Sequence, residues 1–409
     1  MLLARLCRAL IQDGALTLID ADGRTHCFGQ ASRPADVVVR LHDRSLHRRL
    51  VTSPRLALGE AYMEGSLTVE RGGVYDLLDL CARNLGRIDA HPAWRIERAA
   101  ERSASLLRGY YAAARAREDV AHQHDLSDVL YDHFLDWDRQ YSCAYFADGR
   151  MTLEEAQQAK KHHVASKLLL RPGHRVLDIG SGWGGLALHL ADAEHVDVTG
   201  ITLSTQQLAV ARRRALEADL GRRVRFHLRD FREEAGPYDR VVSVGMLEHV
   251  GAPHYGDFFS EIQDVLADDG VAVVHSIGRM TPPRATDPWL RKYISPRAHI
   301  PALSEVLPAV ERAGLWVADV EILRLHYAET LRHWRQRFVS NWERVAAHYD
   351  ARFCRMWEFY LALAETGFRR GGLMVFQLQL AKRIDAVPLT RDYLYERAQS
   401  SASLAAPSD

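Results

Sequence analysis

Val-Leu-Asp-Ile-Gly-Ser-Gly-Trp-Gly-Gly, which spans residues 176–185, is the stretch that decides the fold of this chain. Its apolar first half predicts a buried strand, its glycines predict a tight turn, and a helix is expected from Leu186 to Ala191. Gly180, Gly182 and Gly184 let the backbone pass close to a ligand, and the amides that open the helix favour an anionic group. The stretch therefore predicts the entrance to a nucleotide-type cofactor pocket.

The spacing of these glycines narrows the kind of cofactor. It is Gly-x-Gly-x-Gly, which differs from the Gly-x-Gly-x-x-Gly dinucleotide fingerprint and lacks the Gly-Lys-Ser/Thr of a P-loop. We therefore expect a carboxylate rather than a pyrophosphate in the turn. The pattern resembles motif I of class I S-adenosylmethionine-dependent methyltransferases, which implies that Asp178 closes the first strand and that the turn holds the methionyl end. A turn that needs glycines only for its geometry is the alternative interpretation.

Composition limits the class of protein. The chain has 409 residues, enough for two domains, and Lys plus Arg equals Asp plus Glu at 53 each, which argues against nucleic-acid binding as the main function. The five cysteines are irregularly spaced and include no Cys-x-x-Cys, which is typical of reduced cytosolic thiols and indicates no metal site. No apolar stretch reaches the ~18 residues of a membrane span. We expect a soluble or peripheral protein of the cytoplasm.

The residue pattern divides the chain into four segments. Residues 1–90 hold short apolar segments between turns, which predicts a small α+β domain. Residues 91–120 are rich in Arg and Ala and predict a basic helical linker, for which a solvated helix face is the alternative. Residues 121–395 alternate between helices and strands, which predicts a doubly wound, mainly parallel, Rossmann-like sheet, and residues 396–409 are expected to be disordered. The expected elements of this third segment are helices at 153–170 and 205–218, a strand that begins at Val176, strands at 196–202, 224–228, 240–244 and 271–276, and a late apolar pair at 315–323 and 373–380.

Polar side chains follow several of the expected strands. Ligands of such sheets bind beyond the carboxyl ends of the strands, so these groups are expected to converge on one rim. A lone histidine on an apolar strand, such as His275, is often structural, and Ser204 or Thr205 is expected to cap the helix that follows. Polar groups gathered at the active edge of a sheet nevertheless indicate chemistry. The residues at these strand ends are Thr202, Gln207, Asp230, Glu248 and His275, with the apolar Leu203 and Phe231 beside them.

Five ordered motifs carry a closer resemblance. They are Tyr-Ser-Cys-Ala-Tyr-Phe at 141–146, the glycine stretch at 176–185, Gly-Met-Leu-Glu-His-Val-Gly at 245–251, His-Ser-Ile-Gly at 275–278 and Tyr-Ile-Ser-Pro at 293–296. Together they resemble cyclopropane-fatty-acyl-phospholipid synthases and the related mycolic acid cyclopropane synthases, over roughly residues 56–383. A class I methyltransferase sheet with a smaller N-terminal α+β domain is the fold that this resemblance implies.

The resemblance also implies two groups of site residues. The first group holds S-adenosylmethionine and comprises Tyr141, Ser142, Asp178, Gly180, Gly182, Thr202, Leu203, Gln207 and Phe231, with Asp230 expected within reach of the adenine amino group. The second group holds a bicarbonate ion beside the reacting carbons and comprises Cys143, Glu248, His275, Ile277 and Tyr327. No metal is implied.

The reaction explains why such a cage is needed. An isolated alkene is a weak nucleophile, so methyl transfer from a sulfonium leaves a carbocation that must be shielded from water and then lose a proton to close the ring. A bound bicarbonate supplies negative charge and a proton acceptor. Glu248 is expected to orient the ion by accepting a hydrogen bond from its hydroxyl group. His275 and Tyr327 are expected to donate hydrogen bonds to the ion. Cys143 is expected not to be a nucleophile, and a buried small apolar residue is the alternative for it.

Three positions depart from the family pattern or have no assigned place. His124 stands where the family has a tyrosine, and Val129 stands where it has an acid, which affects the edge of the cofactor site. Glu365, on a helix expected at 361–370, would replace or crowd bicarbonate if it projected into the pocket.

The sequence thus predicts an enzyme that adds a methylene from S-adenosylmethionine across the cis double bond of unsaturated phospholipid acyl chains. The N-terminal segment resembles the phospholipid-acting branch, which implies a homodimer, and the basic linker is expected to dock on an anionic leaflet at the inner face of the cytoplasmic membrane. One alternative is a C-methyltransferase that gives methylene- or methyl-branched chains. Another is a non-catalytic lipid-binding homologue, which the departures at His124 and Val129 suggest.

Overall fold

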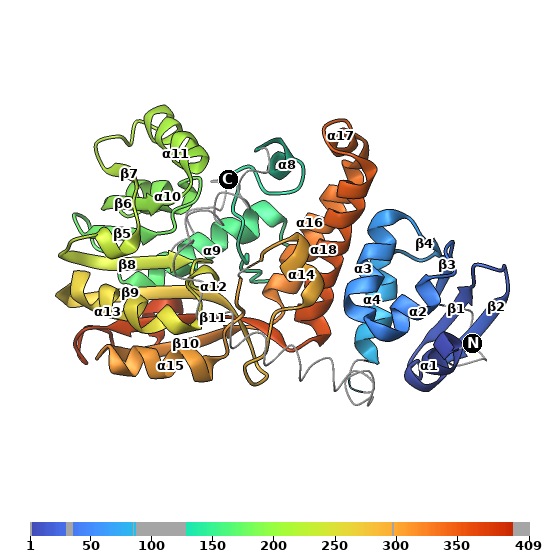
Figure 1. Cartoon of the computed structure of the whole chain (residues 1–409). Coiled ribbons are helices and arrows are strands. Elements are labelled where there is room, and N and C mark those ends of the chain that lie inside the picture. The colour runs from blue at the N-terminus through green and yellow to red at the C-terminus, as the bar shows by residue number, and fades with distance from the viewer. Residues whose placement is uncertain (1, 30–35, 85, 87–127, 297, 396–409) are drawn as a thin grey trace. The chain divides into compact units, whose positions relative to one another are not determined.

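The chain forms two compact units (Figure 1). The computed structural model describes residues 2–29, 36–84, 86, 128–296 and 298–395, so the expected linker at 91–120, the expected tail at 396–409 and His124 lie outside the described residues. The first unit takes its described residues from Met1–Tyr111, Arg284–Ala298 and Ala328–Leu373. The second takes them from Ala112–Pro283, His299–Tyr327 and Met374–Asp409. The first unit therefore includes two segments far beyond the N-terminal 90 residues.

The N-terminal part of the first unit is α+β, as the sequence predicts. Its four-stranded sheet has the order β2-β1-β3-β4, in which β1 is antiparallel to β2 and parallel to β3, and β3 is antiparallel to β4. The strands are β1 (Ala15–Ile19), β2 (Thr25–Gly29), β3 (Val37–Leu41) and β4 (Leu67–Arg71). The helices are α1 (Leu2–Leu10), α2 (Leu46–Thr52), α3 (Pro54–Glu64) and α4 (Val74–Arg83).

The later segments join this unit through aromatic packing. They supply α14 (Pro288–Tyr293), most of α16 (His326–Ser340), α17 (Trp342–Ala346) and α18 (Ala351–Arg370), and α18 packs against α3 and α4 (Figure 1). Trp289 is fully buried, its ring centroid lies 4.6 Å from that of Phe359, and its indole N–H points at the Met63 sulfur at 3.2 Å. A Cβ on Gly59 would lie 2.4 Å from the Trp289 ring, so only glycine leaves room for it. Trp289 and Met63 are more than 200 positions apart, so the local periodicity of either segment does not predict this contact.

The second unit contains the predicted sheet. Its seven strands have the order β10-β11-β9-β8-β5-β6-β7. The pairs β5–β6, β6–β7, β5–β8 and β8–β9 are parallel, and β10–β11 is an antiparallel pair at one edge. The strands are β5 (Arg175–Ile179), β6 (Asp197–Thr202), β7 (Val224–Leu228), β8 (Tyr238–Val244), β9 (Leu266–Arg279), β10 (Trp316–Leu323) and β11 (Leu373–Ala381).

The expected strands of this sheet are confirmed, with shifts of their ends. The largest shift is in β9, which begins five residues earlier than expected because Leu266 already pairs with Tyr238 of β8. The intervening Asp268, Asp269 and Gly270 have the composition of a turn, which hides this extension from a pattern. The helices of this unit are α8 (Asp128–Asp132), α9 (Leu153–Leu168), α10 (Gly185–Ala193), α11 (Thr205–Glu217), α12 (Leu247–Val250), α13 (Tyr255–Val265) and α15 (Leu303–Arg312), with short 3-10 turns η2 (Phe231–Glu233) and η3 (Ala252–His254).

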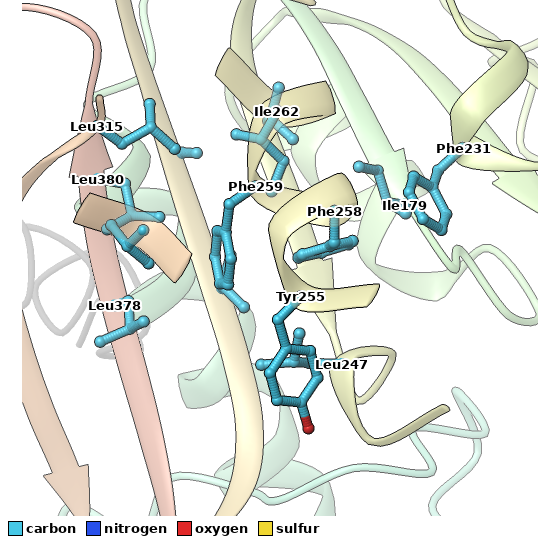
Figure 2. Close-up of a cluster of buried hydrophobic side chains, with 14 of the residues drawn as sticks. Ile179, Phe231, Leu247, Tyr255, Phe258, Phe259, Ile262, Leu315, Leu378 and Leu380 are labelled. Carbon is cyan, nitrogen blue, oxygen red and sulfur yellow. The ribbon is translucent and has the colours of Figure 1, made fainter. Parts of the chain in front are cut away.

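Helices cover both faces of this sheet because the strands are apolar on both sides. Val176, Val198 and Val242 face α9, α10 and α11, whereas the alternate residues Leu177 and Val241 face α13 and α15. Figure 2 shows the second of these clusters, in which the aromatic side chains of α13 fill the layer above the strands. The two cores hold the strands rigidly, so that their carboxyl ends form a fixed rim.

The topology identifies where on this rim a ligand belongs. The chain runs from β5 to β6 on one side and returns to place β8 on the other side of β5, so the strand order reverses between β5 and β8. Ligands of open α/β sheets bind at such a switch point. Within the described ranges, no helix is both long and apolar enough to cross a membrane.

Candidate active site

The glycine turn that follows β5 has backbone angles that favour glycine. Gly180, Gly182 and Gly184 have φ values of +85°, +55° and +84°. A Cβ on Gly184 would lie 2.7 Å from the ring of Phe226, so this glycine is needed for packing. A Cβ on Gly182 would meet no described heavy atom within 4 Å. The turn is therefore packed into the fold at one end and borders open space at Gly182, which suits a ligand cradle.

Asp178, at the end of β5, is a buried acid with an unused acceptor. Asp178 is 2% exposed, and its Oδ2 atom has no hydrogen-bond partner among the described residues. Burial raises the pKa of this carboxyl to about 7, against the lowering effect of the nearby Lys160. Buried polar atoms are normally hydrogen-bonded, so a free carboxylate oxygen beside the turn indicates a missing donor, such as a ligand ammonium.

Lys160 is a buried cation beside the candidate site, and the sequence did not single it out. It lies on α9 and is 1% exposed, and its Nζ donates to Ser142 Oγ at 2.8 Å and to Gln140 Oε1. Within the described part of the chain, no carboxylate lies within ion-pair distance of Nζ, so its hydrogen-bond acceptors are both neutral. Burial lowers the pKa of Lys160 to about 8, although Asp136 works against this. The ammonium therefore places positive charge behind the loop that carries Ser142.

A second contact fixes the same loop from its other end. The Tyr145 ring lies between two imidazoles, with centroid distances of 4.4 Å to His163 and 4.9 Å to His326 and interplanar angles of 21° and 14°. The backbone N–H of Phe146 donates to His326 Nδ1 at 3.0 Å. The segment with the Tyr-Ser-Cys motif is thus tied to the residue that immediately precedes Tyr327.

Glu248, on the short helix α12, is joined directly to β9. Its Oε1 accepts the backbone N–H of Ile277 at 2.6 Å, and its backbone carbonyl accepts the N–H of His299 at 3.0 Å. Glu248 is 5% exposed, and its Oε2 has no hydrogen-bond partner among the described residues. Burial raises the pKa of Glu248 to about 7. The structure therefore brings together two of the predicted cage residues, Glu248 and Ile277, and leaves one carboxylate oxygen available.

His275 lies on β9 two residues before Ile277 and is 2% exposed. Its Nδ1 lies 3.1 Å from Nε2 of Gln377, a fully buried residue of β11 that the sequence analysis also missed. Burial lowers the pKa of His275 to about 3, and the cations Lys160 and Lys167 act in the same direction. The imidazole is therefore neutral near neutral pH.

The residues expected to meet the ribose form a hydrogen-bonded set after β6. Thr202 Oγ1 donates to Gln207 Oε1 at 3.1 Å, and Ser204 Oγ accepts the N–H of Gln207 at 3.3 Å. Ser204 is thus the cap of α11, as expected. Leu203 is half-buried between them.

Asp230 and Phe231 have structural partners that the sequence did not predict. Arg232 donates to both carboxylate oxygens of Asp230, at 2.9 and 2.7 Å, and Asp230 also caps η2. Phe231 packs edge-on against Phe258 at 5.4 Å and belongs to the core cluster of Figure 2. Their expected contacts with adenine stay predictions.

The remaining predicted positions differ in burial and in their contacts. Cys143 is 1% exposed and its thiol donates to the carbonyl of Ala144 at 3.3 Å, and Tyr327 is 7% exposed at the start of α16. Tyr141 packs edge-on against Tyr131 at 5.4 Å. Glu365 belongs to the first unit, where Arg335 and Arg369 hold its carboxylate at 2.9 and 3.0 Å. Val129 is 36% exposed on α8.

Taken together, the carboxyl rim of the second unit combines a glycine cradle with buried groups of unusual protonation. Asp178 and Glu248 have raised pKa values and one free oxygen each within the described residues. Lys160 is a buried cation, and His275 is a neutral ring. Such an edge can bind a ligand that carries an ammonium and can hold an oxyanion away from water.

Two protein families match this chain, and one of them covers most of the unit that contains the candidate site. Residues 112–378 match the family described as mycolic acid cyclopropane synthetase. Residues 13–87 match a family described as a domain of unknown function (DUF7884).

Comparison with individual proteins gives matches over most of the length. The chain is 34% identical over 354 residues to the cyclopropane-fatty-acyl-phospholipid synthase of Escherichia coli, which covers 87% of this chain and 90% of that protein. It is 33% identical over 402 residues to tuberculostearic acid methyltransferase UfaA1 of Mycobacterium tuberculosis, which covers 92% and 90%. Among solved structures, mycolic acid cyclopropane synthase CmaA1 complexed with SAH and CTAB matches with a TM-score of 0.62 and 31% identity, over 65% of this chain and 98% of that one.

Proposed function

This chain belongs to the mycolic acid cyclopropane synthetase family, and we propose that it transfers a methylene group from S-adenosylmethionine to the cis double bond of unsaturated phospholipid acyl chains. Its membership makes it an S-adenosylmethionine-dependent enzyme of lipid acyl-chain cyclopropanation or methylation. The observation that carries the specific proposal is the bond from the Ile277 N–H to Glu248 Oε1, which leaves the buried Oε2 of Glu248 without a hydrogen-bond partner among the described residues.

The glycine turn and its neighbours fit the methyl donor. Gly182 borders open space, and the free Oδ2 of Asp178 is an acceptor for the methionyl ammonium. Ser142 is held by the ammonium of Lys160, which favours a carboxylate near this loop. The donor supplies an electrophilic methyl group on a sulfonium. The other residues proposed to hold it are Tyr141, Gly180, Thr202, Leu203, Gln207, Asp230 and Phe231.

The cage residues fit an oxyanion that takes up a proton. We assign this place to bicarbonate, which supplies one hydroxyl hydrogen and a proton acceptor when bound. Glu248 Oε1 already holds the Ile277 N–H, so Oε2 is the atom left to accept that hydroxyl hydrogen. His275 and Tyr327 donate from the other sides, and Cys143 lines the cage as a small apolar group.

Burial supports a reaction through a cation on the acyl chain. Glu248, His275 and Cys143 are 5%, 2% and 1% exposed. A carbocation formed there is kept from water, so that loss of a proton competes with hydration. The same burial raises the pKa of Glu248, which reduces the negative charge that an anion bound beside it would meet.

Phospholipid as the acceptor rests on the similarity to the Escherichia coli synthase, which extends over both units. Peripheral association with an anionic leaflet at the inner face of the cytoplasmic membrane, and a homodimer, complete this proposal. The basic segment invoked for membrane docking lies outside the described residues.

A second candidate is methylation without ring closure. It is favoured by the similarity to a tuberculostearic acid methyltransferase over 92% of this chain. Such an enzyme shares the donor and the acyl acceptor, but the cation loses a proton to leave a methylene branch instead of closing the ring. A methyl-branched chain requires, in addition, a hydride from a separate reductant.

The fatty-acid profile of a host that expresses the chain separates these candidates. Cyclopropane and methylene products are isomers, so the mass spectrometry must distinguish a ring from a branch. We expect ring-containing acyl chains, and branched products alone would favour the second candidate. A non-catalytic lipid-binding homologue would release no S-adenosylhomocysteine on unsaturated liposomes.

A further inference from the structure

The buried side-chain amide of Gln377 lies within hydrogen-bond distance of the His275 ring. Gln377 lies on β11, next to β9 in the sheet, and its Nε2 is 3.1 Å from His275 Nδ1. Neither side chain has access to solvent beyond 2% of its surface. In this orientation the amide turns its NH₂ group to Nδ1, and its Oε1 has no hydrogen-bond partner among the described residues. An NH₂ group can only donate, so Nδ1 is the acceptor in this bond. A neutral imidazole that accepts at Nδ1 carries its hydrogen on Nε2.

Two features distinguish the contact between Gln377 and His275 from an ordinary structural hydrogen bond. The residues of β11 alternate between Phe376, Leu378 and Leu380, which fill the apolar cluster of Figure 2, and two fully buried glutamines, Gln377 and Gln379. Burying an amide costs free energy unless it is hydrogen-bonded. Gln379 is satisfied by the Lys167 carbonyl and the Tyr393 hydroxyl, whereas the bond of Gln377 is to a site histidine.

The chemistry of the proposed anion explains why the hydrogen position matters. Bicarbonate has one hydroxyl hydrogen, and in the proposed function that hydrogen goes to Oε2 of Glu248. Every other group around the ion must therefore donate to it. A His275 ring with its hydrogen on Nδ1 would turn a lone pair of Nε2 toward an oxygen of the anion, which repels it.

We propose that Gln377 is a positioning residue that holds His275 in its Nε2–H tautomer, so that the ring donates to the oxyanion of the site. This inference rests on the proposed function for its purpose, but the tautomer itself is a property of the free protein. His275 is kept neutral by burial and by the surrounding cations, so a single tautomer is expected near neutral pH.

The tautomer is tested directly by ¹⁵N NMR of the full-length protein labelled at histidine. The His275 signals are assigned as those that disappear in His275→Gln. We expect Nδ1 to resonate in the unprotonated range and Nε2 in the protonated range. A signal from protonated Nδ1 in the wild-type protein would overturn the inference, because the amide would then present its oxygen. This measurement needs no variant of Gln377 to fold and no enzymatic activity.

Variants of Gln377 test the consequence. Gln377→Glu presents only acceptors to Nδ1, so it should move the hydrogen to Nδ1 or make the ring cationic, with a change in the same NMR signals. We expect turnover on unsaturated liposomes to fall by about 10- to 100-fold, the size of loss that follows removal of the hydrogen-bond partner of a metal-ligating histidine. S-adenosylhomocysteine affinity should stay within twofold. Gln377→Met, which offers neither donor nor acceptor, should give an intermediate loss.

Gln379→Met is the matched control, since Gln379 is equally buried on the same strand and bonds to structural groups. We expect it to lower stability without moving the His275 signals. Equal losses of turnover in Gln377→Met and Gln379→Met, at equal stability, would reduce Gln377 to a packing role and refute the proposal. If the wild-type protein shows no turnover at all, the proposed function fails, while the NMR result still decides the tautomer.

Discussion

Glu248→Gln should make the protein more stable and catalytically inactive at the same time. In the folded chain, burial raises the pKa of Glu248 from 4.5 to about 7. The folded carboxyl binds its proton more tightly than the unfolded one, so the folded state is not penalised below the unfolded pKa. The penalty on the folded state grows as pH rises towards the folded pKa, because the unfolded chain then ionises more readily. At 1.36 kcal/mol per pKa unit, the ionised carboxyl costs roughly 3 kcal/mol at pH 8 and under about 1 kcal/mol at pH 5.

The glutamine removes this cost while keeping the local bond. Its amide oxygen can still accept the N–H of Ile277, which Glu248 Oε1 holds at 2.6 Å. Denaturant unfolding at pH 5 and pH 8 should therefore show a stability gain that grows by roughly 2 kcal/mol between the two values. S-adenosylhomocysteine affinity, measured by calorimetry, should be nearly unchanged. Turnover should be lost because the amide NH₂ cannot accept the hydroxyl hydrogen of the anion.

Glu321→Gln provides a control of opposite sign. Burial would raise the pKa of Glu321, but His163 and Lys167 outweigh it and hold the pKa at about 2. Its stabilising contribution is present above pH 4.5 and lost only as pH falls through the folded value, so this variant should be less stable at both pH 5 and pH 8. A Glu248→Gln protein with no pH-dependent gain, or one that loses cofactor affinity and turnover equally, would refute the cage role of Glu248.

Three further predictions follow from the packing and charge of other residues. Lys160→Met should weaken S-adenosylhomocysteine binding by about tenfold, because a charge-assisted hydrogen bond to Ser142 is worth about 1.5–3 kcal/mol; unchanged calorimetric affinity would exclude a cofactor role. Gly184→Ala should lower stability by about 1–3 kcal/mol in thermal unfolding, because its Cβ would lie 2.7 Å from the ring of Phe226, and a wild-type melting temperature would contradict the packing described. Trp289→Ala should cost about 3–5 kcal/mol in denaturant unfolding, since it empties a fully buried site; a loss under about 1 kcal/mol would mean that the segment around α14 is not anchored by this ring.

Much of the second unit was predictable because its information is local. The helix expected at 153–170 ends two residues earlier, and the strand expected at 224–228 has the predicted bounds. Apolar alternation, glycine turns and helix caps act over a few residues, so a pattern records them. The ion pair of Asp230 with Arg232 is also local, yet the sequence did not predict it. An acid that follows a strand is equally typical of a ligand contact and of a helix cap.

The first unit as a whole was not predictable, because it is built from segments that are far apart in the sequence. Its later segments lie more than 200 positions from the N-terminal region that they pack against, as the contact of Trp289 with Met63 illustrates. No periodicity within either segment predicts such a contact. A linear division of the chain by composition therefore cannot recover the compact units.

Lys160 and Gln377, two buried residues beside the candidate site, show what a sequence pattern could and could not have predicted. Lys160 lies on the same helical face as Ala156 and Val164, four residues away on each side, so a lysine in an apolar stripe was visible as an anomaly. Gln377 stands in an alternation of glutamines with apolar residues on a strand that proves to be buried on both faces. In sequence, that alternation is typical of a strand with one solvated face, which gives no reason to expect a buried amide.

The sequence by itself determined the sheet and the glycine turn, because backbone preference and hydrophobic periodicity are properties of neighbouring residues, and its five motifs carried the resemblance to the family. It also supplied Glu248 and His275 as residues at the ends of strands. The tertiary structure decided what these groups are chemically. His275 and Gln377 are 102 positions apart, and Lys160 reaches Ser142 from another element. Hydrogen position, charge and pKa depend on burial and on such distant partners, and only the folded chain brings those together.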